Sequence, residues 1–283
     1  MLRTEPFLRR HFGPEGTLSP VSAPLHKALI AQELLLERLV DALAPPPPVD
    51  EPLLREVTAL VKTFERPQIL RRLLASIRRL YPTLMVVVVD DSRLPVPLED
   101  VKTITMPYDS GISAGRNEGL RHVTTKYVLL LDDDVVFSRH TRLGPALALL
   151  ERYPEIDIMG GQLIELPFLN ARGSPEEAEA IFTTNARPVV PLGSSVGGLT
   201  VCAKVPNFFI ARRDRLALVP WDPQLKRLEH SDFFTRALGT LTTVFNPDLK
   251  CLHARTPFDS EYMRGRLDMA GSGEILTERY GDR

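Results

Sequence analysis

Short apolar segments that alternate with helical ones are the feature of this chain that most restricts its fold. Three continuous Val- and Leu-rich runs, Val57–Val61, Met85–Val89 and Tyr127–Leu131, are separated by two segments with helical spacing, Gln68–Leu80 and Ser113–His122. Apolar runs without polar alternation are typical of strands that are buried on both faces. The pattern therefore predicts an α/β fold with a mainly parallel central sheet and flanking helices.

The later part of the chain continues this pattern. We expect two more helices and four more strands, at Arg142–Arg152 and Phe233–Leu238, and at Ile158–Leu166, Val205–Arg212, Thr242–Phe245 and Leu249–His253. The 283 residues include 35 basic and 36 acidic side chains, and this balance argues against a dedicated nucleic-acid-binding protein. Two cysteines, Cys202 and Cys251, cannot form a disulfide framework, and the sequence leaves open whether they pair.

The N-terminal region differs from the rest of the chain. A Leu-rich helix is predicted from about His26 to Ala44, and it ends at four consecutive prolines, Pro45–Pro48. We therefore divide the chain into a helical extension with a proline linker, residues 1–50, and a main domain, residues 51–283. The helix could pack on the main domain, pair with a second copy or lie on a membrane surface. No apolar stretch of membrane-spanning length and no signal peptide is seen, so we expect a cytoplasmic protein that is at most peripherally membrane-bound.

Polar residues follow each predicted strand, where ligands bind in open parallel sheets. Thr63, Glu65 and Arg66 follow the first strand and could hold a base edge and a phosphate, or could simply form a turn. Asp91 follows the second strand and could accept a hydrogen bond from a uracil ring or cap the next segment. Arg116, in a Gly-rich segment that begins a helix, is placed to approach phosphates at that helix N-terminus.

Three consecutive carboxylates, Asp132, Asp133 and Asp134, directly follow the strand Tyr127–Leu131. Their mutual repulsion and desolvation at the end of a buried strand would be relieved by a bound divalent cation. Hard oxygen ligands suit Mg²⁺ or Mn²⁺, which can bridge to substrate phosphates. The alternative is a helix cap or a solvated loop.

The segment from Trp221 to Asp232 also carries polar residues that could take part in chemistry. Glu229, His230 and Asp232 come just before an apolar helix, where acids are also favoured by the helix dipole. One of the carboxylates could act as a general base, and the alternative is a capping role. His253 follows the last predicted strand, and by itself a lone histidine is more often an ordinary hydrogen-bonded residue than a ligand.

Taken in order, these loops resemble those of the GT-A glycosyltransferases. The likeness is closest to family 12, the β-1,4-N-acetylgalactosaminyltransferases of ganglioside synthesis, and family 2 is the broader relative. It covers about residues 55 to 255. The motifs that carry it are Lys62-Thr63-Phe64-Glu65-Arg66, Asp90-Asp91-Ser92, Gly111 to Asn117, Asp132-Asp133-Asp134, Asn207 to Arg212 and His230 to Phe234.

The resemblance implies a role for each candidate residue. The nucleotide would be held by Thr63, Glu65, Arg66, Asp91, Arg116 and Asp132, and the metal by Asp132, Asp134 and His253. Asp232 is the first candidate for the general base and Glu229 the second. Trp221 and His230 would contact the acceptor or the donor sugar.

The resemblance also implies an activity. It is an inverting transfer, dependent on Mn²⁺ or Mg²⁺, of a sugar from a UDP-sugar to a hydroxyl of a glycan, a glycolipid or another acceptor, which forms a β-glycosidic bond. N-acetylgalactosamine is the favoured sugar, and a hexose is the alternative. Two other functions stay open: a non-catalytic module that binds nucleotide-sugars or acts as a scaffold, and a nucleotidyltransferase. The latter usually has a Gly-rich basic loop after the first strand, where this chain has Lys62 to Pro67.

Overall fold

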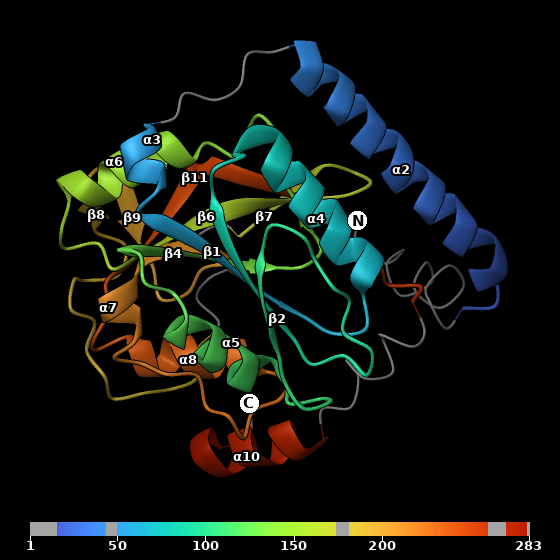
Figure 1. Cartoon of the computed structure of the whole chain (residues 1–283). Coiled ribbons are helices and arrows are strands. Elements are labelled where there is room, and N and C mark those ends of the chain that lie inside the picture. The colour runs from blue at the N-terminus through green and yellow to red at the C-terminus, as the bar shows by residue number, and fades with distance from the viewer. Residues whose placement is uncertain (1–15, 44–49, 174–180, 260–269, 282–283) are drawn as a thin grey trace, which may run out of the picture.

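A computed structural model describes residues 16–43, 50–173, 181–259 and 270–281 of the chain. These residues form a mixed sheet of eleven strands with helices on both faces (Figure 1). The strands are β1 Val57–Thr63, β2 Met85–Asp90, β3 Lys102–Thr105, β4 Tyr127–Asp132, β5 Val135–Val136, β6 Ile158–Glu165, β7 Asn170–Arg172, β8 Ser195–Val196, β9 Leu199–Val201, β10 Phe208–Arg212 and β11 Thr243–His253. The helices are α2 Ser19–Leu43, α3 Glu51–Leu54, α4 Pro67–Leu80, α5 Ile112–Arg121, α6 Leu143–Arg152, α7 Arg213–Leu216, α8 Glu229–Ala237 and α10 Ala270–Tyr280.

Most of the central strands are parallel, as the sequence pattern predicts. The main path of the sheet runs β3-β2-β1-β4-β10-β6-β11-β9-β8. β1 is parallel to β2 and β4, and β6 is parallel to β11. Between these two parallel groups lies β10, which is antiparallel to both β4 and β6. The carboxyl ends of β1, β2 and β4 therefore meet at one edge, and β11 ends near them through its pairing with β5.

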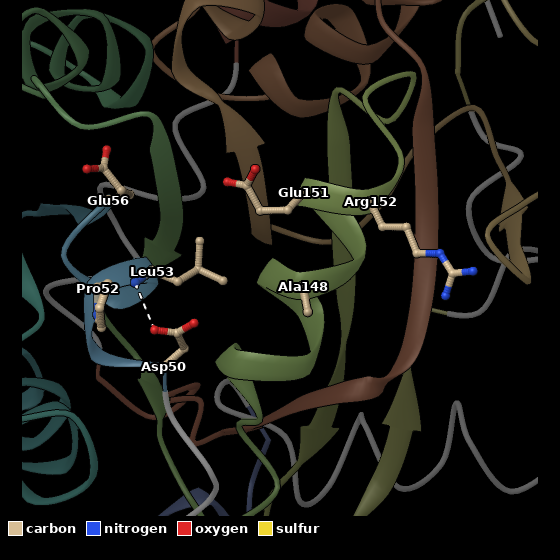
Figure 2. Close-up of a pocket in the computed structure, with 7 residues that line it drawn as sticks. All are labelled: Asp50, Pro52, Leu53, Glu56, Ala148, Glu151 and Arg152. Atoms are coloured by element: carbon tan, nitrogen blue, oxygen red, sulfur yellow. Dashed lines mark hydrogen bonds between the residues drawn. The ribbon is translucent and has the colours of Figure 1, made fainter.

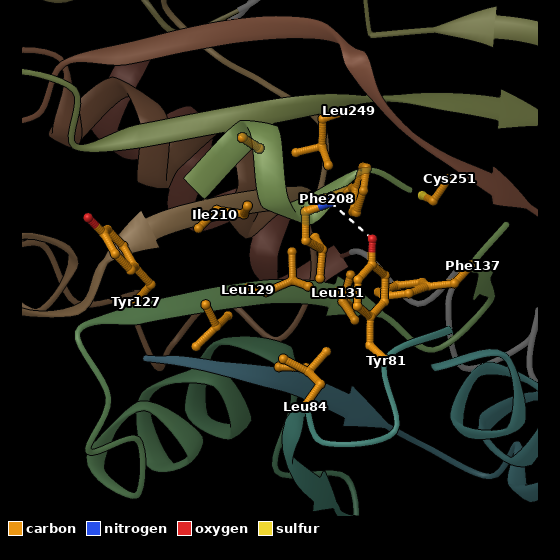
Figure 3. Packing of buried hydrophobic residues seen from close by; sticks show 14 of the residues in the cluster. Tyr81, Leu84, Tyr127, Leu129, Leu131, Phe137, Phe208, Ile210, Leu249 and Cys251 are labelled. Carbon is orange, nitrogen blue, oxygen red and sulfur yellow. Dashed lines mark hydrogen bonds between the residues drawn. The ribbon is translucent and has the colours of Figure 1, made fainter. Parts of the chain in front are cut away.

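The strands are buried on both faces because successive side chains point to opposite sides of the sheet. Val61 and Leu129 belong to a cluster that includes side chains of α4 and α6, whereas Leu60 and Leu130 belong to a second cluster with α5 and α8. Figure 3 shows part of the first cluster, in which Tyr81 and Phe137 pack edge to face with ring centroids 6.1 Å apart. This two-sided burial explains the unbroken apolar runs in the sequence.

Several element boundaries differ from the predicted ones for local reasons. The two late strands are one strand, β11, whose register with β6 shifts between Asn246 and Lys250, around Pro247, which has no amide hydrogen to donate to the ladder. The strand expected from Val205 begins at Phe208, after Pro206. The short strands β3, β5, β7, β8 and β9 and the helices α3, α7 and α10 carry no pattern that would predict them. The predicted linker, Pro45–Pro48, lies outside the described residues.

Helix α2 begins at Ser19, about two turns earlier than the Leu pattern suggests. Pro20 lies in its first turn, where an amide hydrogen has no partner in the helix anyway. The helix packs on the main domain: Ile30 is buried in a cluster with Val136 and Leu252, and Asp41 forms an ion pair of 2.7 Å with Arg79. Of the helices in the described ranges, none has the length and hydropathy needed to cross a membrane.

Candidate functional site

The sheet brings the predicted site residues together at the carboxyl ends of β1, β2 and β4. Thr63 pairs in register with Asp90, and Lys62 pairs with Asp132. At the other end of β1, near its first residue, a separate open pocket of about 730 Å³ lies between α3 and α6 (Figure 2). Figure 2 shows apolar and charged side chains around it, and no predicted site residue is among them. The predicted site residues therefore do not belong to this pocket.

Asp133, which the sequence interpretation did not assign, is the most enclosed of the three consecutive aspartates. It lies with Asp134 in the turn between β4 and β5. The Thr63 hydroxyl donates to its Oδ2 at 2.7 Å, and the Arg66 guanidinium forms an ion pair with its Oδ1. Burial raises the pKa of Asp133, and the positive charge of Arg66 opposes that shift. Asp133 thus fixes Thr63 and Arg66, two of the predicted nucleotide-binding residues.

Asp134 faces His253 across the β5–β11 pair. Its Oδ1 lies 3.2 Å from Nε2 of His253, and its Oδ2 lies 3.2 Å from the Arg66 guanidinium. On the far side of the imidazole, Nδ1 lies 3.0 Å from a carboxylate oxygen of Glu165. Burial alone would lower the pKa of His253, but the Asp134 and Glu165 carboxylates outweigh it and raise the pKa to about 9.

The Asp134–His253 pair fits part of a divalent metal site. A carboxylate oxygen and an imidazole nitrogen converge there, and the carboxylate of Glu165 orients the imidazole from behind, as carboxylates do for metal-bound histidines. Within the part of the chain that the structure describes, no third Asp, Glu, His or Cys side chain joins this pair. Mg²⁺ and Mn²⁺ commonly keep few protein ligands and complete their shell with phosphate oxygens and water, so the two residues suffice for such a site.

Asp132 points away from this pair and toward α5. Its Oδ1 accepts a hydrogen bond from Arg116 at 3.0 Å, and its Oδ2 lies 3.3 Å from the Asn207 side-chain nitrogen. The same Arg116 guanidinium donates to Glu229 at 2.7 Å, so it joins two predicted site carboxylates. Burial raises the pKa of Glu229, against the opposing effect of Arg116. In this arrangement Asp132 contacts the nucleotide-side arginine instead of the Asp134–His253 pair.

The indole ring of Trp221 packs against the guanidinium group of Arg116. It is 2% exposed and stacks on Phe233 with ring centroids 4.7 Å apart. The Arg116 guanidinium lies 5.7 Å from the centre of its indole ring. The sequence interpretation placed Trp221 against a sugar, but its ring packs inside the protein, where it has almost no exposed surface to offer.

Asp91 is the centre of a second small network. Lys62 forms an ion pair with its Oδ1, and the amide of Gly111 donates to its Oδ2 at 3.0 Å. Gly111 has a φ of 90°, in the left-handed region that glycine adopts without strain, and it directly precedes α5. Glu65 lies close by and accepts a hydrogen bond of 2.8 Å from the amide of Arg93. Asp91 and Glu65 therefore border the same edge as Thr63 and Arg66.

Asp232, the first candidate for the general base, lies one turn after Glu229 and faces α10. Its Oδ1 accepts hydrogen bonds from Arg279 at 2.6 Å and from the Tyr280 hydroxyl at 2.9 Å, and its Oδ2 accepts one from Arg236 at 2.8 Å. The residue is 0% exposed. His230 lies between the two carboxylates in sequence and packs edge-on against Phe234; burial lowers its pKa to about 3, so its ring is neutral.

Removing Arg279, one of the two arginines that pair with Asp232, should loosen the contact of the C-terminal helix with the rest of the protein. Arg279 also bonds Asp222 at 2.6 Å, so the Arg279→Ala variant loses two ion pairs. Because Arg279 is itself one-third exposed, we expect a loss of about 1–3 kcal/mol in the free energy of unfolding, measured by urea denaturation. The control is Arg121→Ala, whose ion pair with Glu118 is on the surface and should cost less than about 1 kcal/mol. Equal effects of the two variants would contradict this role.

A larger cavity of about 960 Å³ opens beside Arg66, between α2, the start of α4 and the segment after β11. Its walls carry the basic side chains of Arg66, Arg72 and Arg255 and apolar side chains such as Ile30 and Phe258. The Arg72 guanidinium donates to the carbonyl of Ala254, next to His253, at 3.0 Å. The cavity thus connects the predicted nucleotide edge with the N-terminal helix.

The sequence interpretation did not include several residues of the site. Glu165 is the last residue of β6, and Asn207 directly precedes β10. Arg279 and Tyr280 come from the C-terminal helix. Asn207 lies in a motif of the noted resemblance and could have been chosen. The other three residues carry no local signal, because their roles depend on which segments meet in space. Both cysteines are buried and unpaired.

Comparison with known proteins gives a consistent family assignment. Residues 58–215 match the family model described as glycosyl transferase family 2. The chain is 39% identical over 207 residues to rat β-1,4 N-acetylgalactosaminyltransferase 1, covering 70% of this chain and 39% of the rat protein. It is 37% identical over 212 residues to mouse β-1,4 N-acetylgalactosaminyltransferase 2, covering 71% and 40%. The chain therefore spans well under half the length of these relatives.

Solved structures support the fold. The structure of S. aureus TarS superposes with a TM-score of 0.53 at 20% identity, covering 78% of this chain and 39% of that one. A complex of TarS residues 1–349 with UDP-GlcNAc gives a TM-score of 0.52 at 16% identity, covering 78% and 66%. These likenesses confirm the predicted GT-A architecture.

Proposed function

Because the chain belongs to glycosyl transferase family 2, we propose that it is a glycosyltransferase that moves a sugar from a UDP-sugar to an acceptor hydroxyl with inversion at the anomeric carbon. The observation that carries the proposal is that Asp132 and Asp134, the two outer aspartates of the triplet, point in different directions. Asp134 faces His253, whereas Asp132 is joined through Arg116 to Glu229. The pair proposed to hold the metal and the proposed base would thus lie on either side of one strand end, an arrangement that suits single displacement on a nucleotide-sugar.

The nucleotide half of the donor would lie along the edge formed by Thr63, Glu65, Arg66 and Asp91. Asp91 is held by Lys62 and Gly111, so its carboxylate is fixed in place at the end of β2. Arg66 and Arg116 supply positive charge toward the phosphates, and Asp133 and Asp132 fix their guanidinium groups. Preorganised cations of this kind stabilise a diphosphate leaving group without reorganising during the reaction.

Asp134 and His253 would hold a Mn²⁺ or Mg²⁺ ion against the diphosphate. When bound, such an ion neutralises the negative charge that develops on UDP as the bond from the sugar to the phosphate breaks. Glu165 keeps the His253 ring oriented for this role through Nδ1. Removal of the ion by a chelator during the donor assay tests its participation.

We propose Glu229 as the general base in preference to Asp232. Both carboxylates are buried, but the two oxygens of Asp232 accept three hydrogen bonds, so Asp232 would have to break contacts with α10 before reaching a substrate. Glu229 lies at the start of α8, beside Arg116, and burial raises its pKa, which makes it a stronger base than an ordinary glutamate. It would take the proton of the acceptor hydroxyl as that oxygen attacks the sugar from the face opposite UDP.

We propose N-acetylgalactosamine as the transferred sugar. The support is that relatives sharing 36–39% identity with this chain are named N-acetylgalactosaminyltransferases. The test is incubation of the purified chain with UDP-GalNAc, UDP-GlcNAc, UDP-galactose and UDP-glucose, with released UDP measured by coupled assay. We expect the fastest release from UDP-GalNAc, and loss of release in EDTA with recovery on adding Mn²⁺. Release of pyrophosphate would instead indicate a nucleotidyltransferase, and tight UDP binding without any release would indicate a non-catalytic module.

A further inference from the structure

Helix α2 has two apolar faces, and the described residues cover only one of them. The inner face packs on the main domain through Ile30, which is 7% exposed, and through Leu34. The outer face carries large apolar side chains in contact with solvent, among them Leu25 at 57% exposure and Leu39 at 54%. Figure 1 shows α2 as a long helix at the periphery, and none of the described helices or strands lies on its outer side. A helix that packs on one side only would not need leucines on the other.

The exposed leucines of α2, apart from Leu35, follow a seven-residue repeat. One position of the repeat is Leu18, Leu25, Gln32 and Leu39, and the second is Ser22, Leu29, Leu36 and Leu43. The alternating spacing of four and three residues is the a/d pattern of helices that pair as coiled coils. It extends over the 25 residues of α2, a length of about 37 Å at the ordinary rise of an α-helix. Three and a half repeats are enough to specify a helix pair.

The charge on α2 favours a protein partner over a membrane. The helix carries two basic residues, Lys27 and Arg38, and three acidic ones, Glu33, Glu37 and Asp41. Lys27 and Arg38 also line the cavity beside Arg66, on the side of the helix that faces the main domain. Helices that lie on anionic lipid normally have a strongly basic polar face, which α2 lacks. An a/d face that is apolar except at Ser22 and Gln32 is complementary to a copy of itself.

We propose that two copies of this chain form a homodimer in which the outer faces of their α2 helices pair. The two-fold axis passes near Gln32, at the middle of the helix, so the two Gln32 amides meet between apolar leucines and hydrogen-bond to each other, which fixes the register. The inner face of each helix keeps its contacts with its own main domain, including the Asp41–Arg79 ion pair. The main domains therefore lie on the outside of the pair, with their carboxyl edges accessible. This dimer does not depend on the proposed reaction.

The first experiment measures the mass of the full chain by light scattering at concentrations from about 1 to 100 µM. The wild-type chain should show twice its own mass of 31.7 kDa. Leu36→Glu, which places a charge in the seam, should give the monomer mass with unchanged UDP release. Leu94→Glu, the same change at a leucine 81% exposed outside α2, should leave the dimer intact. A monomeric wild-type chain, or a dimer that Leu36→Glu leaves intact, overturns the proposal.

A second experiment locates the seam and does not depend on the folding of a charged variant. The Gln32→Cys variant should form a disulfide-linked dimer under mild oxidation, because the two positions meet at the axis, whereas Ala31→Cys, one residue away on the same helix, should not. The native cysteines are buried and do not interfere. Equal cross-linking at both positions, or none at Gln32→Cys, contradicts the proposed register. Binding of the monomer to vesicles of anionic phospholipid through Leu36 would assign the face to a membrane instead.

Discussion

The Asp134→Asn variant should lose sugar transfer by about a thousandfold or more while keeping its fold. Asp134 is the carboxylate that faces His253, and together they are the pair that fits a divalent cation. Replacing the carboxylate by an amide removes the charge that attracts the cation, and metal assistance contributes several kcal/mol to reactions of this kind, at about 1.4 kcal/mol for each tenfold. The amide keeps the size of the side chain, so β5 should still pair with β11.

Calorimetry of UDP binding, measured beside turnover, should separate the effect of Asp134→Asn on metal binding from its effect on catalysis. We expect calorimetry to show that Mn²⁺ strengthens UDP binding to the wild-type chain and leaves UDP binding to Asp134→Asn unchanged. The matched control is Asp248→Asn, an exposed carboxylate on the irregular part of β11, which should behave as wild type in both assays. Wild-type turnover by Asp134→Asn, with the Mn²⁺ effect intact, would place the metal elsewhere.

The central sheet could be predicted from the sequence because burial on both faces leaves a strong local signal. Val57–Thr63 and Tyr127–Asp132 are buried at nearly every position and mostly apolar, since alternate side chains meet helices on opposite sides. The antiparallel direction of β10 left no comparable signal. Its apolar residues fit either direction, and only the pairing of Phe209 with Leu130 and Gly160 sets it. Edge strands such as β8 are too short to show any period.

The location of the site was also predictable, but its internal pairing was not. Ligands bind at the carboxyl ends of parallel strands, and this rule alone, applied to the strand pattern, brings Thr63, Asp91 and Asp132 to one edge. Which aspartate of the triplet faces which partner depends on the turn at Asp133 and Asp134. At this turn β4 has ended, and its side chains no longer alternate between the two faces of the sheet. The local sequence around Asp232 likewise contains no sign of Arg279, because that contact forms only when α10 folds back on α8.

The Glu229→Gln variant should lower kcat by about 10²- to 10⁴-fold, the usual contribution of a general base. Glutamine keeps the shape of the side chain and can still accept the hydrogen bond from Arg116, so the KM for the UDP-sugar should change little. Its amide cannot take up a proton from the acceptor hydroxyl. The expected loss is therefore in the chemical step and not in donor binding, which steady-state kinetics at saturating acceptor can measure.

The pH dependence of kcat tests independently whether Glu229 is the general base. A base must be deprotonated to work, so wild-type kcat should fall as the pH drops through the pKa of Glu229. Burial raises that pKa, so the fall should come at a higher pH than for an ordinary glutamate. In Glu229→Gln the residual rate should lose this acidic limb, because the group that titrates is gone.

Asp232→Asn is the matched comparison, since it neutralises a carboxylate one helical turn away. Loss of the negative charge of Asp232 leaves Arg279 and Arg236 without their shared counter-charge, so we expect the free energy of unfolding to fall by about 1–3 kcal/mol. The kcat of the folded protein should remain within a few-fold of wild type. The reverse pattern, a stable Asp232→Asn variant without turnover beside an active Glu229→Gln variant, would return the role of base to Asp232 and require α10 to move away during each reaction cycle.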